Sequence, residues 1–216
     1  MPINDVHQAY SDMRPRWRKN RAAIAGQDAV KREGTLFLPD DSSGDESTQA
    51  RGRYARYLMR ATWLKVCGYT KEGLIGMVFR LPPSVELPPA LDYMLENADG
   101  AGSSLAEFSR LATGENLEVG RFGLLTDYPA SETGLSREQI AARKLQARLT
   151  LYRAEAVDNW RTELIGGLTT LTMVKLYEIS SRYVDEFSAQ DVIQYRVLRL
   201  RDGVYTQALY TEGGAE

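Results

Sequence analysis

Apolar residues recur three or four positions apart through most of the first 120 residues, which is the spacing of one face of an α-helix. The pattern predicts helices over residues 3–26, 27–33 and 46–66. Gly34 ends the second of these, and the short apolar run at 35–39 predicts an extended segment. Pro15 fits the first turn of a helix better than its interior, so the first helix is expected to begin near that residue.

Three further helices complete the first half of the chain. The helix over 71–79, with Thr70 as its N-cap, is nearly all apolar, so we expect it to be buried. The prolines that follow stop it, and Pro89 suits the first turn of a short helix. Ser104 and Glu107 form a Ser-x-x-Glu capping box, which predicts the start of the last helix of this half.

After residue 120, apolar and polar residues alternate in the pattern of half-buried strands. Strands are predicted over residues 121–127, 148–153, 160–165, 169–178, 194–201 and 204–211. Gly166-Gly167 and Asp202-Gly203 have the composition of two-residue hairpin turns, and the second turn sets Leu200 opposite Tyr205. Residues 180–190 are expected to form a loop.

The order of these elements predicts an α+β fold, in which a helical portion over residues 1–120 packs on a mostly antiparallel sheet formed by residues 121–216. The last strand, over residues 204–210, is long and partly apolar for an exposed edge. We therefore expect another subunit, or chain beyond these residues, to pair with it.

The composition is that of an ordinary globular protein, with 43% hydrophobic residues, 26% charged residues and a formal net charge of -2. Proteins that bind nucleic-acid phosphates carry a marked excess of Lys and Arg, and this chain has none. Tight general binding of nucleic acid is therefore not expected. No stretch approaches the roughly 20 apolar residues of a membrane span, and no secretory signal is visible. We expect synthesis in the cytosol and no membrane association.

The chain has one cysteine, Cys67, and one histidine, His7. A lone cysteine excludes an internal disulfide, and the two residues cannot supply the roughly four ligands of a structural zinc site. We expect a buried thiol at Cys67, a surface imidazole at His7, and no metal or cofactor. The acidic stretch at 40–46 lacks the glycine and the closing glutamate of a calcium loop, so we interpret it as a surface loop.

Two groups of charged residues are candidates for function. Five basic residues crowd the first helix, namely Arg14, Arg16, Arg18, Lys19 and Arg21. They form either a strip that faces nucleic acid or an acidic partner, or the solvated face of an amphipathic helix. Asp99 and Asp127 belong to an alternative in which they act as acid and base or as metal ligands of an enzyme, although carboxylates beside glycine and proline are also ordinary turn residues.

Eight segments, in order along nearly the whole chain, carry a resemblance to a known family. They are Trp17 with the Arg-rich turn after it, and residues 30–39, 54–61, 73–80 (GLIGMVFR), 99–108, 120–129 (GRFGLLTDYP), 152–160 and 195–205. Each segment is weak alone, and the ordered set resembles the portal proteins of tailed bacteriophages. Because members of that family are longer, the chain resembles their N-terminal wing portion, without the stem and clip regions.

The resemblance implies a structural role and no enzymatic activity. Portal subunits form a ring, commonly a dodecamer, at one vertex of the capsid, through which DNA enters and leaves. The implied partners are further copies of the chain, the major capsid protein, the large terminase subunit, head–tail adaptor or tail proteins, and double-stranded DNA. The implied location is the virion, and the host cytoplasm during assembly. The nearly balanced charge agrees with this role, because tight phosphate binding would hold DNA that must slide.

Overall fold

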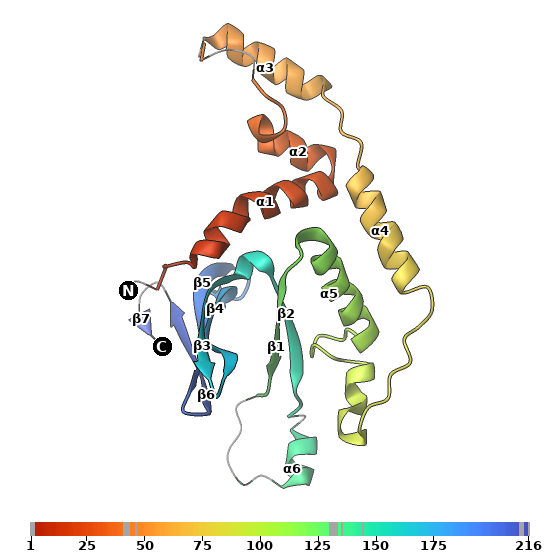
Figure 1. Ribbon diagram of the computed structural model, residues 1–216, viewed down its shortest axis with the longest axis vertical. Helices are drawn as coiled ribbons and strands as arrows, with labels where there is room; N and C mark the ends of the chain where they lie inside the picture. Colours follow the sequence, from red (N-terminus) through yellow and green to blue (C-terminus); the bar gives the residue numbers. More distant parts are fainter. Residues whose placement is uncertain are drawn as a thin grey trace. The chain divides into compact units, whose positions relative to one another are not determined.

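The computed structural model describes residues 3–40, 44, 45, 47–129, 134, 136–143, 145–211, 214 and 215. These residues form an α+β fold with six α-helices and two antiparallel sheets, so the predicted fold class is confirmed (Figure 1). Most of the predicted acidic loop at 40–46 lies outside the described residues.

Contacts between residues divide the chain into two compact units, each of which is discontinuous in sequence. Unit 1 comprises Met1–Arg14, Pro88–Phe108 and Arg121–Glu216, and unit 2 comprises Pro15–Leu87 and Ser109–Gly120. The helices α1 (Gln8–Ala25) and α5 (Leu105–Val119) each contribute residues to both units.

Unit 1 contains a five-stranded antiparallel sheet in the order β3-β4-β5-β6-β7 (Figure 1). Its strands are β3 (Val157–Ile165), β4 (Leu168–Tyr183), β5 (Ala189–Arg201), β6 (Val204–Thr211) and β7 (Gly214–Ala215). Both predicted hairpins are confirmed: Gly166-Gly167 joins β3 to β4, and Asp202-Gly203 joins β5 to β6 with Leu200 opposite Tyr205. These turn residues have positive φ, which glycine adopts without strain and aspartate tolerates.

The outer edge of β6 is open over most of its length. β7 pairs only with Tyr210 and Thr211, so among the described residues no strand lies on the outer side of residues 204–209. The partner expected for this edge stays a prediction.

Unit 1 also contains a separate antiparallel pair, β1 (Phe122–Asp127) and β2 (Arg148–Arg153). The short helix α6 (Arg137–Ala142) lies in the connection between them, and the 3₁₀ turn η3 (Ala154–Ala156) joins β2 to β3. The unit has a hydrophobic core around Tyr152, Val157 and Leu176. A Cβ atom added to Gly123 would lie 2.9 Å from Val157 Cγ2, so glycine is required there for β1 to approach the start of β3.

The segment before α1 is fixed to unit 1 by a buried lysine. Lys175 is 3% exposed, and its Nζ donates to the carbonyl oxygens of Ile3 at 2.7 Å and Asp5 at 2.8 Å. The same Nζ lies 3.1 Å from Asp158 Oδ2 in an ion pair, and Asn159 Nδ2 donates to the Asp5 carbonyl at 2.9 Å. Burial of an ammonium group is costly unless it is paired, so these contacts couple the N-terminal segment to the stability of the sheet.

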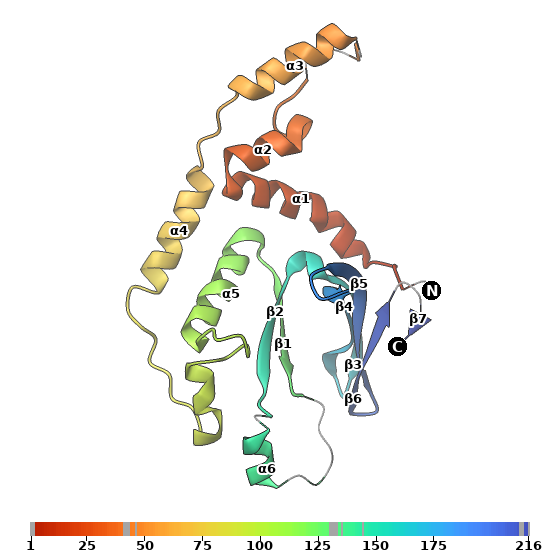
Figure 2. The same ribbon diagram turned by 180° about the vertical axis from the view of Figure 1, so that it is seen from behind.

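Unit 2 is helical, and α3 and α4 are two separate helices joined by an extended stretch (Figure 2). It holds the greater parts of α1 and α5 together with α2 (Gln27–Glu33), η1 (Gly34–Leu36), α3 (Thr48–Arg60) and α4 (Val66–Val78). The 3₁₀ segment η2 (Pro89–Leu95) belongs to unit 1. Trp17 and Val30 are the largest fully buried side chains of the described residues, and both lie in unit 2.

Two helix starts differ from their predictions. α1 begins at Gln8, so Pro15 lies inside the helix and not in its first turn. Burial of Tyr10 and Trp17 on either side of the proline offsets the loss of one backbone hydrogen bond. α4 begins at Val66, which places Thr70 inside it and not at its N-cap.

Tertiary contacts override two further local predictions. Residues 34–36 form a 3₁₀ turn and not an extended segment, and Tyr54 fixes the chain that follows by donating its hydroxyl to the Leu38 carbonyl at 2.9 Å. α3 ends at Arg60 and not at residue 66, because the indole N–H of Trp63 bonds to the Ala23 carbonyl at 3.3 Å.

The capping box at the start of α5 is confirmed. Glu107 N donates to Ser104 Oγ at 3.2 Å, and Ser104 N donates to Glu107 Oε2 at 2.8 Å. These reciprocal bonds satisfy two backbone donors that the first turn of a helix otherwise leaves unpaired.

Two glycines of α4 are expected to respond in opposite ways to alanine. At Gly68 the added Cβ would lie 2.6 Å from the Ile24 carbonyl oxygen, so Gly68→Ala is expected to lower the free energy of unfolding by about 1–3 kcal/mol. Gly73 has no atom within 4 Å of its added Cβ, so Gly73→Ala is expected to raise that free energy by about 0.5–1 kcal/mol. Urea unfolding of both variants measures the difference, and equal effects would contradict the close approach at Gly68.

Candidate functional site

Helix α4 exposes apolar side chains that its sequence predicted to be buried. Of its residues only Gly68 and Ile75 are buried, whereas Leu74, Met77 and Val78 are 38%, 67% and 62% exposed. The prediction of a buried helix was therefore wrong. The apolar composition of α4 indicates that it packs against a partner, but among the described residues nothing covers most of its apolar surface. Exposed apolar surface of this kind marks an interaction site.

An apolar groove lies in unit 1 between β1 and the face of the sheet. Its volume is about 570 Å³, and apolar side chains from β1, β3, β4 and β5 dominate its lining. Leu124 and Leu171 are 55% and 50% exposed at the groove, so it is open to a partner. Arg121 supplies positive charge: its guanidinium carbon lies 4.1 Å from the centre of the Trp160 ring, and Nη2 donates to the Val157 carbonyl at 3.2 Å.

A cluster of polar side chains shares this face of β4. The carboxylate of Glu178 accepts hydrogen bonds from Tyr152 Oη at 2.6 Å, Arg196 Nε at 2.7 Å and Gln194 Nε2 at 2.7 Å. Burial alone would raise the pKa of Glu178, but the bonds from Arg196, Tyr152 and Gln194 outweigh it and hold that pKa below its usual range. Burial, followed by the bond to Glu178, raises the pKa of the Tyr152 hydroxyl. Every member of the cluster bonds within it, which is the arrangement of a structural network.

Beyond the groove, β4 and β5 continue as a two-stranded arm. β3 reaches only as far as Leu176 of β4, and β6 reaches only as far as Gln194 of β5. β4 and β5 nevertheless pair without interruption to Tyr183 and Ala189. The loop predicted over 180–190 is therefore confined to residues 184–188, and the residues on either side of it are strand. We call residues 179–193 the β4–β5 arm.

The tip of the arm displays apolar side chains in a hydrogen-bonded turn. Tyr183, Val184 and Phe187 are 79%, 67% and 91% exposed. Asp185 Oδ1 accepts from the backbone N–H of Phe187 at 2.9 Å and of Ser188 at 2.8 Å, which fixes the turn that presents Phe187. Polar residues occupy both faces of the two strands here, so the alternation of apolar and polar residues that predicts a strand is absent. The arm could therefore not be predicted from the sequence.

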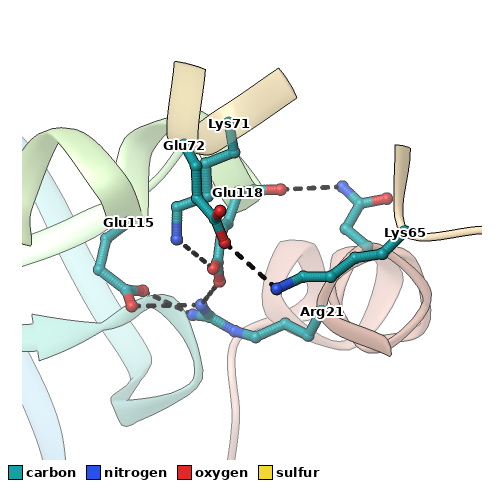
Figure 3. Close-up of polar contacts among 7 residues, drawn as sticks. Arg21, Lys65, Lys71, Glu72, Glu115 and Glu118 are labelled. Carbon is teal, nitrogen blue, oxygen red and sulfur yellow. Dashed lines mark hydrogen bonds and ion pairs between the residues drawn. The ribbon is translucent and has the colours of Figure 1, made fainter. Parts of the chain in front are cut away.

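The predicted basic residues have different surroundings. Arg14, Arg16, Arg18 and Lys19 are exposed on α1, and Arg18 also pairs with Glu33. Arg21 is instead a structural residue of unit 2: its guanidinium pairs with Glu115 at 2.7 Å and also with Glu118 (Figure 3). A nucleic-acid or partner-facing role for these five residues stays a prediction.

The network around Arg21 joins α1, α4 and α5 within unit 2. Lys71 of α4 pairs with Glu118 of α5, and nearby Lys65 pairs with Glu72 at 3.2 Å (Figure 3). Burial alone would raise the pKa of Glu118, but hydrogen bonds from Lys71 and Arg21 outweigh it and hold the pKa below its usual range. Glu118 therefore contributes stability at neutral pH that is lost as the pH falls through its own lowered pKa.

The carboxylates of the enzyme alternative both serve local turns. Asp99 Oδ1 accepts from the backbone N–H groups of Ala101 at 2.8 Å and Ser103 at 3.1 Å, and Asp127 Oδ1 accepts from that of Tyr128 at 3.0 Å. Among the described residues, no group of three or more His, Cys, Asp or Glu side chains could hold a metal ion. The enzyme alternative stays untested.

The single cysteine and the single histidine have separate environments. Cys67 is exposed on α4, so the predicted buried thiol was wrong. The imidazole of His7 stacks on the Trp160 ring with centres 4.0 Å apart. Among the described residues, no contact of Cys67 or His7 indicates nucleophilic chemistry.

Comparisons with known proteins give no family assignment. No protein-family model matches the chain, and a search of curated proteins finds no significant match. In the part of the chain that the structure describes, no helix combines the length and the apolar character needed to cross a membrane. The resemblance to portal proteins therefore stays a prediction.

Proposed function

We propose that the chain is a structural subunit of a phage portal, and that it forms the wing portion of a ring at one vertex of the capsid. The ordered set of family-like segments supports this role. Its partners are then other copies of the chain, the capsid protein, the large terminase subunit, adaptor or tail proteins, and the DNA that passes through the ring. It acts in the virion, after assembly in the host cytoplasm.

The exposed apolar surface is the observation that carries the proposal. Large apolar side chains stand exposed in both units, on α4 of unit 2 and at the tip of the β4–β5 arm of unit 1, where Tyr183, Val184 and Phe187 are 79%, 67% and 91% exposed. A protein that acts as a monomer rarely leaves this much apolar surface in water. A subunit that packs against copies of itself covers such surface on assembly.

The mass and shape of the purified chain test the proposal. Native mass spectrometry is expected to give one species whose mass is several times the 24.2 kDa of a single chain, and negative-stain micrographs are expected to contain rings with a central hole. A compact monomer at every concentration would contradict the proposal. Salt-dependent binding of duplex DNA by such a monomer would favour the nucleic-acid-binding alternative, and metal-dependent turnover lost in Asp99→Asn and Asp127→Asn would favour the enzyme.

A further inference from the structure

In the part of the chain that the structure describes, no other strand supports the β4–β5 arm. All described residues from 181 to 191 are exposed, and past Leu176 and Gln194 the two strands pair only with each other. A two-stranded hairpin alone in water is marginally stable. An arm with an aromatic side chain 91% exposed at its tip therefore gains stability when another surface covers it.

The groove of unit 1 has the complementary character. It is lined mainly by apolar side chains, and its volume of about 570 Å³ falls in the range of roughly 300–1,000 Å³ that is typical of binding pockets. Its charged lining residue is Arg121, whereas the tip of the arm carries the carboxylates of Asp185 and Glu186 beside Phe187. Apolar contact and opposite charge therefore match between the groove and the tip.

The arm cannot fill the groove of its own chain. Leu176 lines the groove, and Tyr183 stands seven residues further along the same strand, which is about 23 Å at the rise of a β-strand. Because β4 and β5 are paired without interruption over this length, the arm cannot fold back. The tip and the groove can meet only between different molecules.

We propose that the tip of the β4–β5 arm of one copy of the chain inserts Phe187 into the apolar groove of the next copy, with Glu186 facing Arg121. Two different surfaces then meet, so the contact is head-to-tail and repeats from copy to copy, which closes a ring when the rotation permits. This inference rests on the proposed function for its occupant, a second copy of the chain.

Two single variants and their mixture test the contact. Phe187→Ser removes the tip, and Leu171→Glu places charge in the groove at a half-exposed position that a folded protein tolerates. Each variant is expected to weaken self-association about tenfold or more in sedimentation velocity. Mixed in equal amounts, the variants retain one intact tip and one intact groove for each pair, so they are expected to form a two-chain species and nothing larger.

The matched control is Leu164→Ser. Leu164 is 74% exposed at the opposite hairpin end of the same sheet, so this variant removes comparable apolar surface without touching arm or groove. It is expected to assemble as the wild-type chain does. Circular dichroism and urea unfolding of all three variants check that each is folded, and Leu124→Glu replaces Leu171→Glu if the latter is not.

The outcomes separate this inference from the proposed function. If the wild-type chain forms rings and Phe187→Ser or the groove variant assembles equally well, the ring stands, the arm–groove contact is overturned, and the arm is left for a different protein. Variants that dissociate but form no pair when mixed would overturn it too. If the wild-type chain is monomeric at every concentration, the ring and the arm–groove contact are both overturned.

Discussion

Replacement of Glu178 by glutamine is expected to lower the free energy of unfolding by about 3 kcal/mol. The side chain is 13% exposed and its partner Arg196 is 18% exposed, so the change leaves a largely buried guanidinium without its counter-charge. The hydroxyl of Tyr152 also loses its charged acceptor. Urea unfolding at pH 7 measures the loss.

The control for this variant lies in the same sheet. Arg161 is exposed on β3, so Arg161→Gln is expected to change the free energy of unfolding by about 0.5 kcal/mol or less. A loss in Glu178→Gln no larger than in this control would mean that solvent satisfies the cluster, contrary to the burial described.

The pH dependence of Glu178 has a definite sign. Its pKa is lowered in the folded protein, so the carboxylate stabilises the fold above the ordinary glutamate pKa of about 4.3, and this stabilisation is lost as the pH falls through the lowered value. The wild-type chain should therefore lose more stability on acidification below about pH 4.3 than Glu178→Gln does. Parallel curves for the two proteins would contradict this reasoning.

Replacement of Lys175 by methionine is expected to lower the free energy of unfolding by about 3–5 kcal/mol at pH 7. The change leaves the buried carboxylate of Asp158 without its counter-ion and removes both bonds to the N-terminal segment. The double variant Lys175→Met with Asp158→Asn removes the stranded charge, so it is expected to recover a large part of the loss.

A lower pH is expected to restore part of the free energy of unfolding that Lys175→Met loses at pH 7. Burial raises the pKa of Asp158 already in the wild-type chain, where Lys175 opposes the shift, so removal of Lys175 raises that pKa further. A carboxyl group whose pKa is higher when folded stabilises the fold below its unfolded pKa, near 3.9, and this stability is lost as the pH rises through the folded value. The deficit against the wild-type chain is therefore expected to be smaller at pH 5 than at pH 7, and an equal deficit at both would contradict the buried charge.

Features set by neighbouring residues could be predicted from the sequence. The capping bonds between Ser104 and Glu107 join residues three apart, and the turn at Asp202-Gly203 fixes the register of β5 and β6 by its own length. In both cases the chemistry that forms the element is contained within a few positions. The order of such locally determined helices, strands and turns along the chain was sufficient to predict the α+β fold class.

Features set by partners distant in sequence could not be predicted. Lys175 occupies a polar position of an alternating strand, and it is buried where the N-terminal segment, Asp158 and the Tyr195 ring surround its ammonium group. Similarly, the sequence of α4 shows that the helix is apolar, but it does not show whether the surface that covers the helix belongs to the same chain. The groove is assembled from strands whose side chains meet through sheet pairing, so no local pattern marks it.

The attachment of the N-terminal segment to Lys175 has a consequence for synthesis on the ribosome. The Ile3 carbonyl and its donor are 172 residues apart, so the segment that carries Ile3 leaves the ribosome before β4 is made and cannot bind until then. At about 5–20 residues per second this delay is roughly 10–30 s. A polypeptide released early, before β4 is made, would leave the segment around Ile3 and Asp5 without its bonds to Lys175, which gives quality-control proteases a means to distinguish it from a chain that contains β4.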